Sequence, residues 1–324
     1  MREEVIREDS TALSYTVIGS RKETVSASRS GARVSAAILA HCGRTFDPAV
    51  AISLFRAGIE SVLYLTSSME PGLAQKRTHE FLGLRFMLFS HDTSPAIMMN
   101  GAMREASGDL VLVLDGEMSI HESGFSGRLL QRIEETGYFG IAPRLFESGG
   151  GELAVASIPL GSARGREFRQ LSIMPDLALT PTLYPVGFAG FYNRSEYRAV
   201  GGCDIGYSTR YWAEIDLGFR VWLSGRRFGI LSSFSLTCKR EILAEDRGCG
   251  RDAARFWLKN IAPVYDGDRV VLPRRSLWTF LQKRKGQPLR AVREYRELRI
   301  WVRENAFRFV TDSAGLTEMW GDTV

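Results

Sequence analysis

Short apolar runs alternate with longer mixed stretches along most of the chain. The apolar runs have the length of strands and cover residues 33–40, 61–65, 110–114 and 228–231. The mixed stretches predict helices, three of which begin at a proline, at residues 48–59, 71–82, 95–106 and 124–136. Strands that alternate with helices indicate an α/β fold with a mostly parallel central sheet flanked by helices.

The run at 110–114 is followed at once by two carboxylates, Asp115 and Glu117, separated by one glycine. Its uniformly apolar residues are typical of a strand buried on both faces, and ligands of open α/β sheets bind at the ends of such strands. If the strand geometry continues, the two carboxylates point to the same side with Cα atoms about 6.5 Å apart. Hard oxygen ligands of this kind suit Mg²⁺ or Mn²⁺. Taken alone, Asp-Gly-Glu also fits an acidic turn without a ligand.

Three elements stand in a fixed order around these carboxylates. The first runs from Asn100 through a predicted helix that closes on Gly108, and ends on the strand with its acids. The second contains Gly201-Gly202-Cys203-Asp204, and the third is Ala213-Glu214-Ile215-Asp216-Leu217. The third element leads into a predicted amphipathic helix that starts after Asp216 and ends near Gly225. In this order the elements resemble the family 2 glycosyltransferases of the GT-A fold, over roughly residues 33 to 260.

The resemblance implies a GT-A (nucleotide-diphospho-sugar transferase) fold that moves a sugar from a nucleotide-diphosphate donor to a hydroxyl acceptor, with inversion. It implies a divalent cation, Mg²⁺ or Mn²⁺, at Asp115 and Glu117. It places Glu214 in the position of the general base, with Asp216 as the other catalytic acid. The residues that it aligns with donor binding are Asn100, Asp115, Gly201, Gly202 and Thr66.

Several positions depart from the family pattern. Ala213-Glu214 replaces the usual Glu-Asp pair, and Thr66 stands where the family has an Asp that contacts the nucleotide base. The family often has a metal-binding His near residues 237–239, where this chain offers Cys238 and Lys239. A Glu performs the same proton transfer as an Asp when its reach and pKa allow. The alternative hypothesis is a catalytically silent relative that binds a nucleotide sugar or a partner protein as a scaffold or regulator.

Composition favours a protein without a bilayer span. The chain has 324 residues, of which 44% are hydrophobic, and no apolar run reaches the length that crosses a bilayer. The first ten residues are charged and lack the apolar segment of a signal peptide, which predicts a cytoplasmic protein. Its four cysteines show no C-x-x-C spacing and predict neither a metal cluster nor a disulfide framework.

The pattern divides the chain into three parts. Residues 1–30 are predicted to form a flexible leader, and residues 31–262 a catalytic domain with a nucleotide-sugar half at 31–120 and an acceptor half at 121–262. Within the acceptor half, residues 147–184 predict a variable hairpin and loop. Residues 263–324 are predicted to form a basic helical extension.

The basic charge is concentrated in the extension. Residues 269–310 hold twelve Arg or Lys against three Glu, and apolar positions 295, 298, 302, 306 and 309 fit a helical stripe. One interpretation is a helix packed on the catalytic domain with a solvated basic face. The others are a surface that meets anionic lipid, which would place the protein at the inner membrane surface beside a lipid-linked acceptor, or a surface that binds an acidic partner. Glycan or protein acceptors remain open, and no nucleic-acid partner is expected because no binding motif accompanies the charge.

Overall fold

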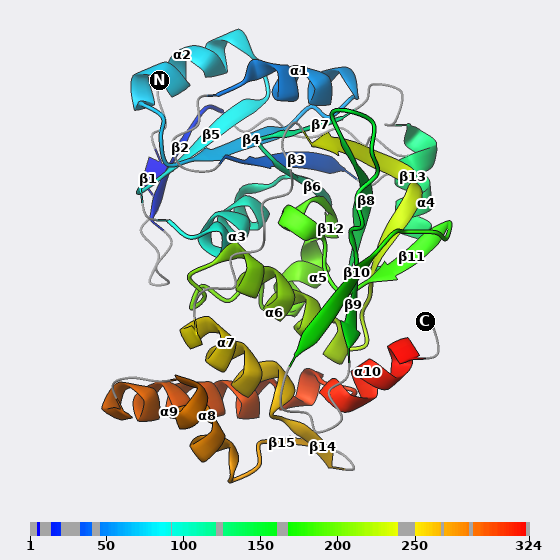
Figure 1. Ribbon diagram of the computed structural model, residues 1–324. Coiled ribbons are helices and arrows are strands. Elements are labelled where there is room, and N and C mark those ends of the chain that lie inside the picture. Colours follow the sequence, from blue (N-terminus) through cyan, green and yellow to red (C-terminus); the bar gives the residue numbers. More distant parts are fainter. Residues whose placement is uncertain are drawn as a thin grey trace.

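Strands from both halves of the chain join in one mixed sheet, and helices cover both of its faces (Figure 1). The computed structural model describes residues 5–6, 14–20, 33–40, 46–91, 93–120, 126–160, 168–238, 250–266, 269–284 and 288–321. All structural statements below concern these residues. The α/β class and the mostly parallel core of the sheet are as the sequence predicts.

The parallel half of the sheet contains four buried strands. These are β3 (Val34–Leu39), β4 (Val62–Thr66), β5 (Leu84–Phe89) and β6 (Leu110–Asp115). β3 lies between β4 and β6, and Leu39 is in register with both Leu65 and Asp115. Parallel neighbours present their carboxyl ends at one edge, so Thr66 and Asp115 lie at the same edge, one strand apart.

The other half of the sheet contains antiparallel neighbours as well. β12 (Gly190–Asn193) lies antiparallel between β6 and β8 (Gly140–Glu147). β8 pairs in parallel with β13 (Phe228–Cys238), which also pairs with β11 (Leu179–Thr182) and β7 (Met118–Ile120). The long strand β13 has a register shift between Ile230 and Ser235 and brings its C-terminal end opposite β7, next to the end of β6.

One part of the predicted leader belongs to the sheet. β2 (Tyr15–Ile18) pairs antiparallel with β5, and β1 (Val5–Ile6) pairs with β2. The Tyr15 hydroxyl also donates a hydrogen bond of 3.1 Å to Glu105. The prediction of a flexible leader is therefore wrong for these strands, because pairing with an existing edge strand, which composition does not reveal, orders them. The full sheet order is β1-β2-β5-β4-β3-β6-β12-β8-β13-β11.

The helices form two layers (Figure 1). α1 (Pro48–Arg56), α2 (Pro71–Glu80) and α4 (Gly127–Glu135) pack on one face of the sheet, and α3 (Pro95–Glu105) packs on the other. The predicted helices exist, but they end one to three residues before the predicted ends. After α1 and α2 the chain turns through Gly58 and Gly83, whose positive φ angles suit the reversal toward the next strand.

The predicted variable region forms a hairpin outside the main sheet. β9 (Ala156–Leu160) pairs antiparallel with β10 (Arg169–Ile173). The predicted loop between them falls largely on residues 161–167, which lie outside the described residues.

The C-terminal part is mainly helical and packs against the α3 side of the domain (Figure 1). We count α7 (Gly250–Phe256) and η3 (Trp257–Ile261) with this part, although they precede the predicted boundary at residue 263, because they pack on α8 and α9. The other elements are α8 (Ser276–Arg284), α9 (Pro288–Asn305), η4 (Ala306–Arg308), α10 (Ser313–Gly321) and a small hairpin of β14 (Val264–Asp266) and β15 (Arg269–Val271). In α9 the predicted stripe positions Tyr295, Leu298 and Val302 are buried, as a packed helix requires. No helix in the described ranges is both long and apolar enough to cross a membrane. Contact of the basic face with lipid or an acidic partner stays a prediction.

Candidate active site

The two carboxylates that follow β6 lie in a turn. Asp115 is the last residue of β6, and Glu117 lies in the turn that leads to β7. The Glu117 backbone N–H donates a hydrogen bond of 3.1 Å to Asp115 Oδ1. The extended geometry assumed from the sequence therefore does not continue past Asp115, because the chain reverses to start a new strand. The carboxylates remain neighbours at the edge of the sheet, and the hydrogen bond fixes the orientation of Asp115.

Arg210 connects this edge to the helix that carries the predicted base. Its Nη1 lies 3.0 Å from Asp115 Oδ2, and its Nε lies 3.4 Å from Glu214 Oε1. One guanidinium thus bridges two carboxylates that are far apart in the sequence. Sequence reasoning missed Arg210, although its i,i+4 spacing to Glu214 was a visible indication that the two side chains would pair on a helix.

Glu214 and Asp216 both lie inside α6 (Arg210–Leu223), whereas the sequence predicted a helix that starts after them. Nearly the whole circumference of α6 is buried, so the polar face that would have marked its start is missing. Its beginning is fixed from another element instead. Asp252 of α7 accepts hydrogen bonds from the backbone N–H groups of Ser208 and Thr209, of 2.8 and 3.3 Å.

A strained turn, η2 (Val186–Phe188), packs against both β6 and α6. Gly187 has φ 69° and Phe188 has φ 55°, and a bulky residue rarely adopts a positive φ. Phe188 is buried, and its carbonyl accepts a hydrogen bond of 3.0 Å from the Tyr192 hydroxyl. The surrounding core thus holds an unfavourable backbone conformation between the two elements that carry Asp115 and Glu214, as is common next to functional sites.

Cys238 ends β13 near the same edge. It pairs with Met118 across the β7–β13 ladder, and burial together with the Asp115 charge raises the pKa of its thiol to about 11. The thiol is therefore protonated at neutral pH. Lys239, the other predicted substitute for the family's metal-binding His, lies outside the described residues. Within the described ranges no three His, Cys, Asp or Glu side chains are grouped as a ready-made metal site.

Asn100 and the glycine pair hold a turn together. Asn100 Oδ1 accepts hydrogen bonds from the Tyr197 hydroxyl at 2.6 Å and the Cys203 N–H at 2.9 Å, and its Nδ2 donates to the Cys203 carbonyl at 2.9 Å. Gly201 and Gly202 have positive φ, and a Cβ on Gly202 would lie 2.7 Å from Asn100 Oδ1. In the structure, Asn100 and the two glycines contact each other and their neighbours in the protein, because α3 packs directly on the turn at residues 201–203. The predicted contacts of these residues with the nucleotide-sugar substrate stay a prediction.

Thr66 lies at the sheet edge as predicted, at the end of β4. Its side chain is buried, and Oγ1 accepts a hydrogen bond of 3.1 Å from the Ser68 N–H. Of the predicted residues, Asp115, Glu117 and Glu214 are joined through hydrogen bonds and Arg210, whereas Thr66 lies apart from them by the width of β3.

Two glycosyltransferases of known structure have a similar fold. The chain superposes on GalNAc-T7 with UDP, GalNAc and Mn²⁺ with a TM-score of 0.56 and 9% identity, over 84% of this chain and 56% of that one. It superposes on S. aureus TarS 1–349 in complex with UDP-GlcNAc with a TM-score of 0.52 and 12% identity, over 82% of this chain and 71% of that one. The chain has a GT-A glycosyltransferase fold. No protein-family model and no curated protein matches it, and it spans only about half of the GalNAc-T7 chain.

Asp216 lies in the interior of this GT-A domain. It is 0% exposed and accepts hydrogen bonds from four side chains: Tyr207 at 2.9 Å, Asn260 at 2.8 Å, Arg220 at 2.8 Å and Lys259 at 2.9 Å. These donors surround the carboxylate completely. A catalytic role for Asp216 thus conflicts with its position, because an acid that exchanges protons with substrate must be reachable from the site.

A second buried carboxylate shares one of these donors. Asp204, which follows the glycine pair, lies 2.6 Å from Lys259 Nζ and forms a two-pronged ion pair with Arg255 at 2.9–3.1 Å. Lys259 and Arg255 come from η3 and α7, so these ion pairs fasten the C-terminal part to the GT-A domain. Sequence reasoning did not identify this role, because the partners are more than 40 residues from the acids they bind.

The buried ion pairs predict a specific loss of stability in acid. Burial by itself would raise the pKa of both carboxyl groups, Asp204 and Asp216. The charges of Lys259 and Arg255 nevertheless lower the pKa of Asp204 below its usual value. The charges of Lys259 and Arg220 lower the pKa of Asp216 in the same way. Unfolded Asp has a pKa near 3.9, so the stabilisation is complete above that value and is lost as the pH falls toward the lower folded pKa values. Below about pH 4, the free energy of unfolding should fall by about 1.4 kcal/mol per pH unit for each of these carboxyl groups.

Urea denaturation at a series of pH values tests this expectation. An unfolding free energy that stays constant from neutral pH to about pH 3 would contradict it.

Proposed function

We propose that the protein transfers a sugar from a nucleotide-diphosphate donor to a hydroxyl acceptor with inversion at the anomeric carbon. The observation that carries the proposal is the bridge Asp115–Arg210–Glu214, which lies where the carboxyl end of β6 meets α6 in a GT-A fold. The two superposed proteins were solved with UDP and UDP-GlcNAc respectively. Ligands of open α/β sheets bind at this edge.

In the proposed reaction the acceptor oxygen attacks the anomeric carbon and the bond between that carbon and the diphosphate oxygen breaks. Glu214 takes the proton from the acceptor hydroxyl, and the nucleoside diphosphate leaves with the bonding electron pair. Without donor, the Arg210 guanidinium compensates the charges of Asp115 and Glu214. When the diphosphate binds, Arg210 can turn toward it, because guanidinium donors match phosphate oxygens. This movement would release Glu214 to act as the base.

The carboxylates also fit a divalent cation, which we propose as part of the donor site. Mg²⁺ and Mn²⁺ are commonly held by one or two carboxylates together with substrate phosphates, and Asp115 and Glu117 supply this donor set at the sheet edge. Such a cation would neutralise the charge of the departing diphosphate. Asp115 Oδ2 is already paired with Arg210, so cation binding and the Arg210 contact must share this carboxylate.

Thermal-shift measurements with a panel of nucleotide sugars, with and without Mn²⁺, test the proposal. A donor at one hundred times its Kd should stabilise the protein by about 2.7 kcal/mol. D115N should abolish the part of the stabilisation that depends on Mn²⁺, and R210Q should reduce the part that does not. D176N and R132Q change an exposed Asp and an exposed Arg away from the site and should behave like the parent.

The variants separate the two sources of positive charge. Equal stabilisation in D115N and the parent would reject the cation site, and equal stabilisation in R210Q would reject a diphosphate contact by Arg210. If no nucleotide sugar stabilises the parent protein, the donor assignment itself is wrong.

A further inference from the structure

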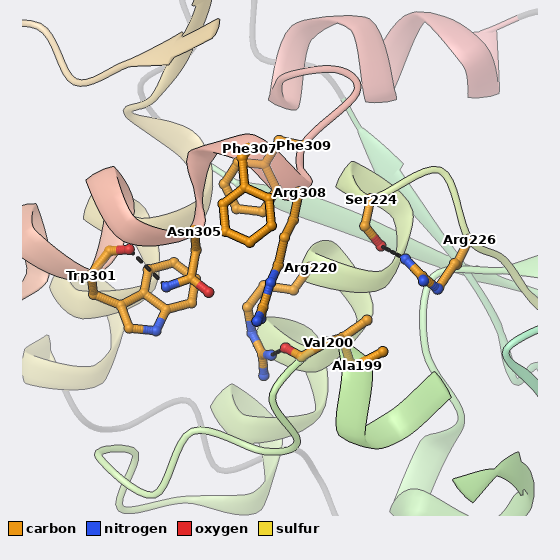
Figure 2. A pocket seen from close by; sticks show the side chains of 10 residues that line it. All are labelled: Ala199, Val200, Arg220, Ser224, Arg226, Trp301, Asn305, Phe307, Arg308 and Phe309. Atoms are coloured by element: carbon orange, nitrogen blue, oxygen red, sulfur yellow. Dashed lines mark hydrogen bonds between the residues drawn. The ribbon is translucent and has the colours of Figure 1, made fainter. Parts of the chain in front are cut away.

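A cavity of about 340 Å³ lies between the GT-A domain and the C-terminal part, at the ends of α6 and of α5 (Arg194–Ala199). The opposite wall comes from the end of α9 and from η4 (Figure 2). We call it the C-terminal cavity. Arg220, which lines the cavity, lies six residues after Glu214 on α6, so this wall is about 9 Å further along the helix axis and about a third of a turn around it. It is therefore a separate place in the fold.

Three arginines line the C-terminal cavity, and one of them lacks a carboxylate. Arg226 is paired with Glu196, and Arg220 is paired with Asp216 at 2.8 Å. Arg308 makes no ion pair in the part of the chain that the structure describes. Figure 2 shows its side chain pointing from η4 toward Arg220. An anion beside the Arg308 guanidinium would therefore be favoured.

The charges behind the wall add to this excess. The buried network contains two carboxylates, Asp204 and Asp216, against three cations, Arg220, Arg255 and Lys259. The residues joined by these ion pairs therefore contain one more cation than carboxylate, in a region of low dielectric where charges act strongly. At the cavity itself, Arg308 supplies a positive charge without a carboxylate partner, which an anionic group such as phosphate would balance.

Aromatic side chains complete the cavity. Phe307 is 79% exposed, and the Arg308 guanidinium carbon lies 5.4 Å from the centre of its ring. Trp301 also lines the cavity, with Lys259 Nζ 4.2 Å from its ring centre. An exposed aromatic ring beside the cavity offers a platform on which a ligand ring can stack.

We propose that the C-terminal cavity binds a phosphate group carried on a ring compound, either a sugar phosphate or a nucleotide, as a second site apart from the donor site. The phosphate lies between Arg308 and Arg220 and accepts hydrogen bonds from the Arg308 guanidinium, whereas Arg220 keeps its contacts and contributes charge. The ring stacks on Phe307. A volume of 340 Å³ is in the range of small-molecule sites.

Isothermal titration calorimetry of the full chain with inorganic phosphate, glucose 6-phosphate and UMP tests the proposal. At least one of the two ring compounds should bind more tightly than inorganic phosphate, and the one that binds identifies the ring. R308Q should weaken binding by about tenfold to a hundredfold, because it removes a charge-assisted contact. F307A should weaken binding of the ring compound but not of inorganic phosphate. R303Q removes an exposed arginine of α9 outside the cavity lining and should have no effect.

Two further controls decide whether the site is the proposed one. D115N should leave this binding unchanged, so loss of binding in D115N with retention in R308Q would place the ligand in the donor site and overturn the proposal. Equal losses in R308Q and R303Q would indicate nonspecific attraction and overturn it as well. Absence of binding for inorganic phosphate, glucose 6-phosphate and UMP at millimolar concentration would also reject it.

Discussion

Replacing Asp216 with asparagine is expected to destabilise the protein by about 3–5 kcal/mol, because it leaves buried cations without their partner. The variant keeps the size of the side chain but leaves Asp204 as the one carboxylate of the network against Arg220, Arg255 and Lys259. Four side chains donate hydrogen bonds to the Asp216 carboxylate. The Asn amide has only one oxygen that accepts hydrogen bonds, and its NH₂ group donates, so it cannot satisfy all four donors. Urea denaturation at neutral pH measures the effect.

The matched variant is K259M, which should be tolerated better although Lys259 is equally buried. It leaves two carboxylates, Asp204 and Asp216, with two arginines, so the network becomes neutral. Each carboxylate keeps at least one arginine contact, and the Met side chain fills a space similar to that of the Lys stem. If D216N is as stable as the parent and K259M unfolds, the charge argument fails.

Replacing Glu214 with glutamine is expected to lower turnover by about 10²- to 10⁴-fold, the usual cost of losing a general base. Gln keeps the size and much of the hydrogen-bonding capacity, but it cannot take the proton of the acceptor hydroxyl. Donor affinity should hardly change if Glu214 acts on the acceptor side. The measurement is a steady-state assay with any active acceptor, or hydrolysis of the donor by water. E318Q, which changes an exposed Glu of α10, is the control.

The outcome of this experiment also separates the two functional hypotheses. Unchanged turnover in E214Q would reject Glu214 as the base. Asp216 would not replace it, because four side chains enclose its carboxylate. A parent protein that binds donor tightly but never turns it over would instead favour the silent binding protein.

The local sequence was sufficient for four strands of the GT-A domain, β3, β4, β6 and the start of β13, and for the helices α1 to α4. The run that ends at Asp115, and the prolines that begin α1, α2 and α3, depend on burial and backbone geometry within a few residues. Such features are visible in one stretch of sequence. The start of α6 was not visible, because a helix buried on all sides has no polar face and its first turn is held by Asp252 of α7.

The functional roles predicted from the motifs also depended partly on local sequence and partly on packing. The motif order placed Asp115 at the end of β6 and Glu214 near it, and the structure brings the two together through Arg210. The same motifs placed Asn100 in the donor site, but its amide is used to hold the turn at Cys203. A motif states which residue types recur, whereas the partner of each side chain depends on how separate elements pack.

The sequence by itself determined the fold class, the alternation of strands and helices from β3 to α3 apart from β5, and the carboxylate at the end of β6, since these follow from local hydrophobic patterning and chain geometry. Only the tertiary structure decided the pairing of Arg210 with Asp115, the enclosure of Asp216 and the place of Arg308 in the C-terminal cavity. The physical reason is that these contacts depend on distances between side chains that are 40 or more residues apart in the chain, such as Arg210 and Asp115 or Asn260 and Asp216. Those distances are set when the helices pack, and no local pattern encodes them.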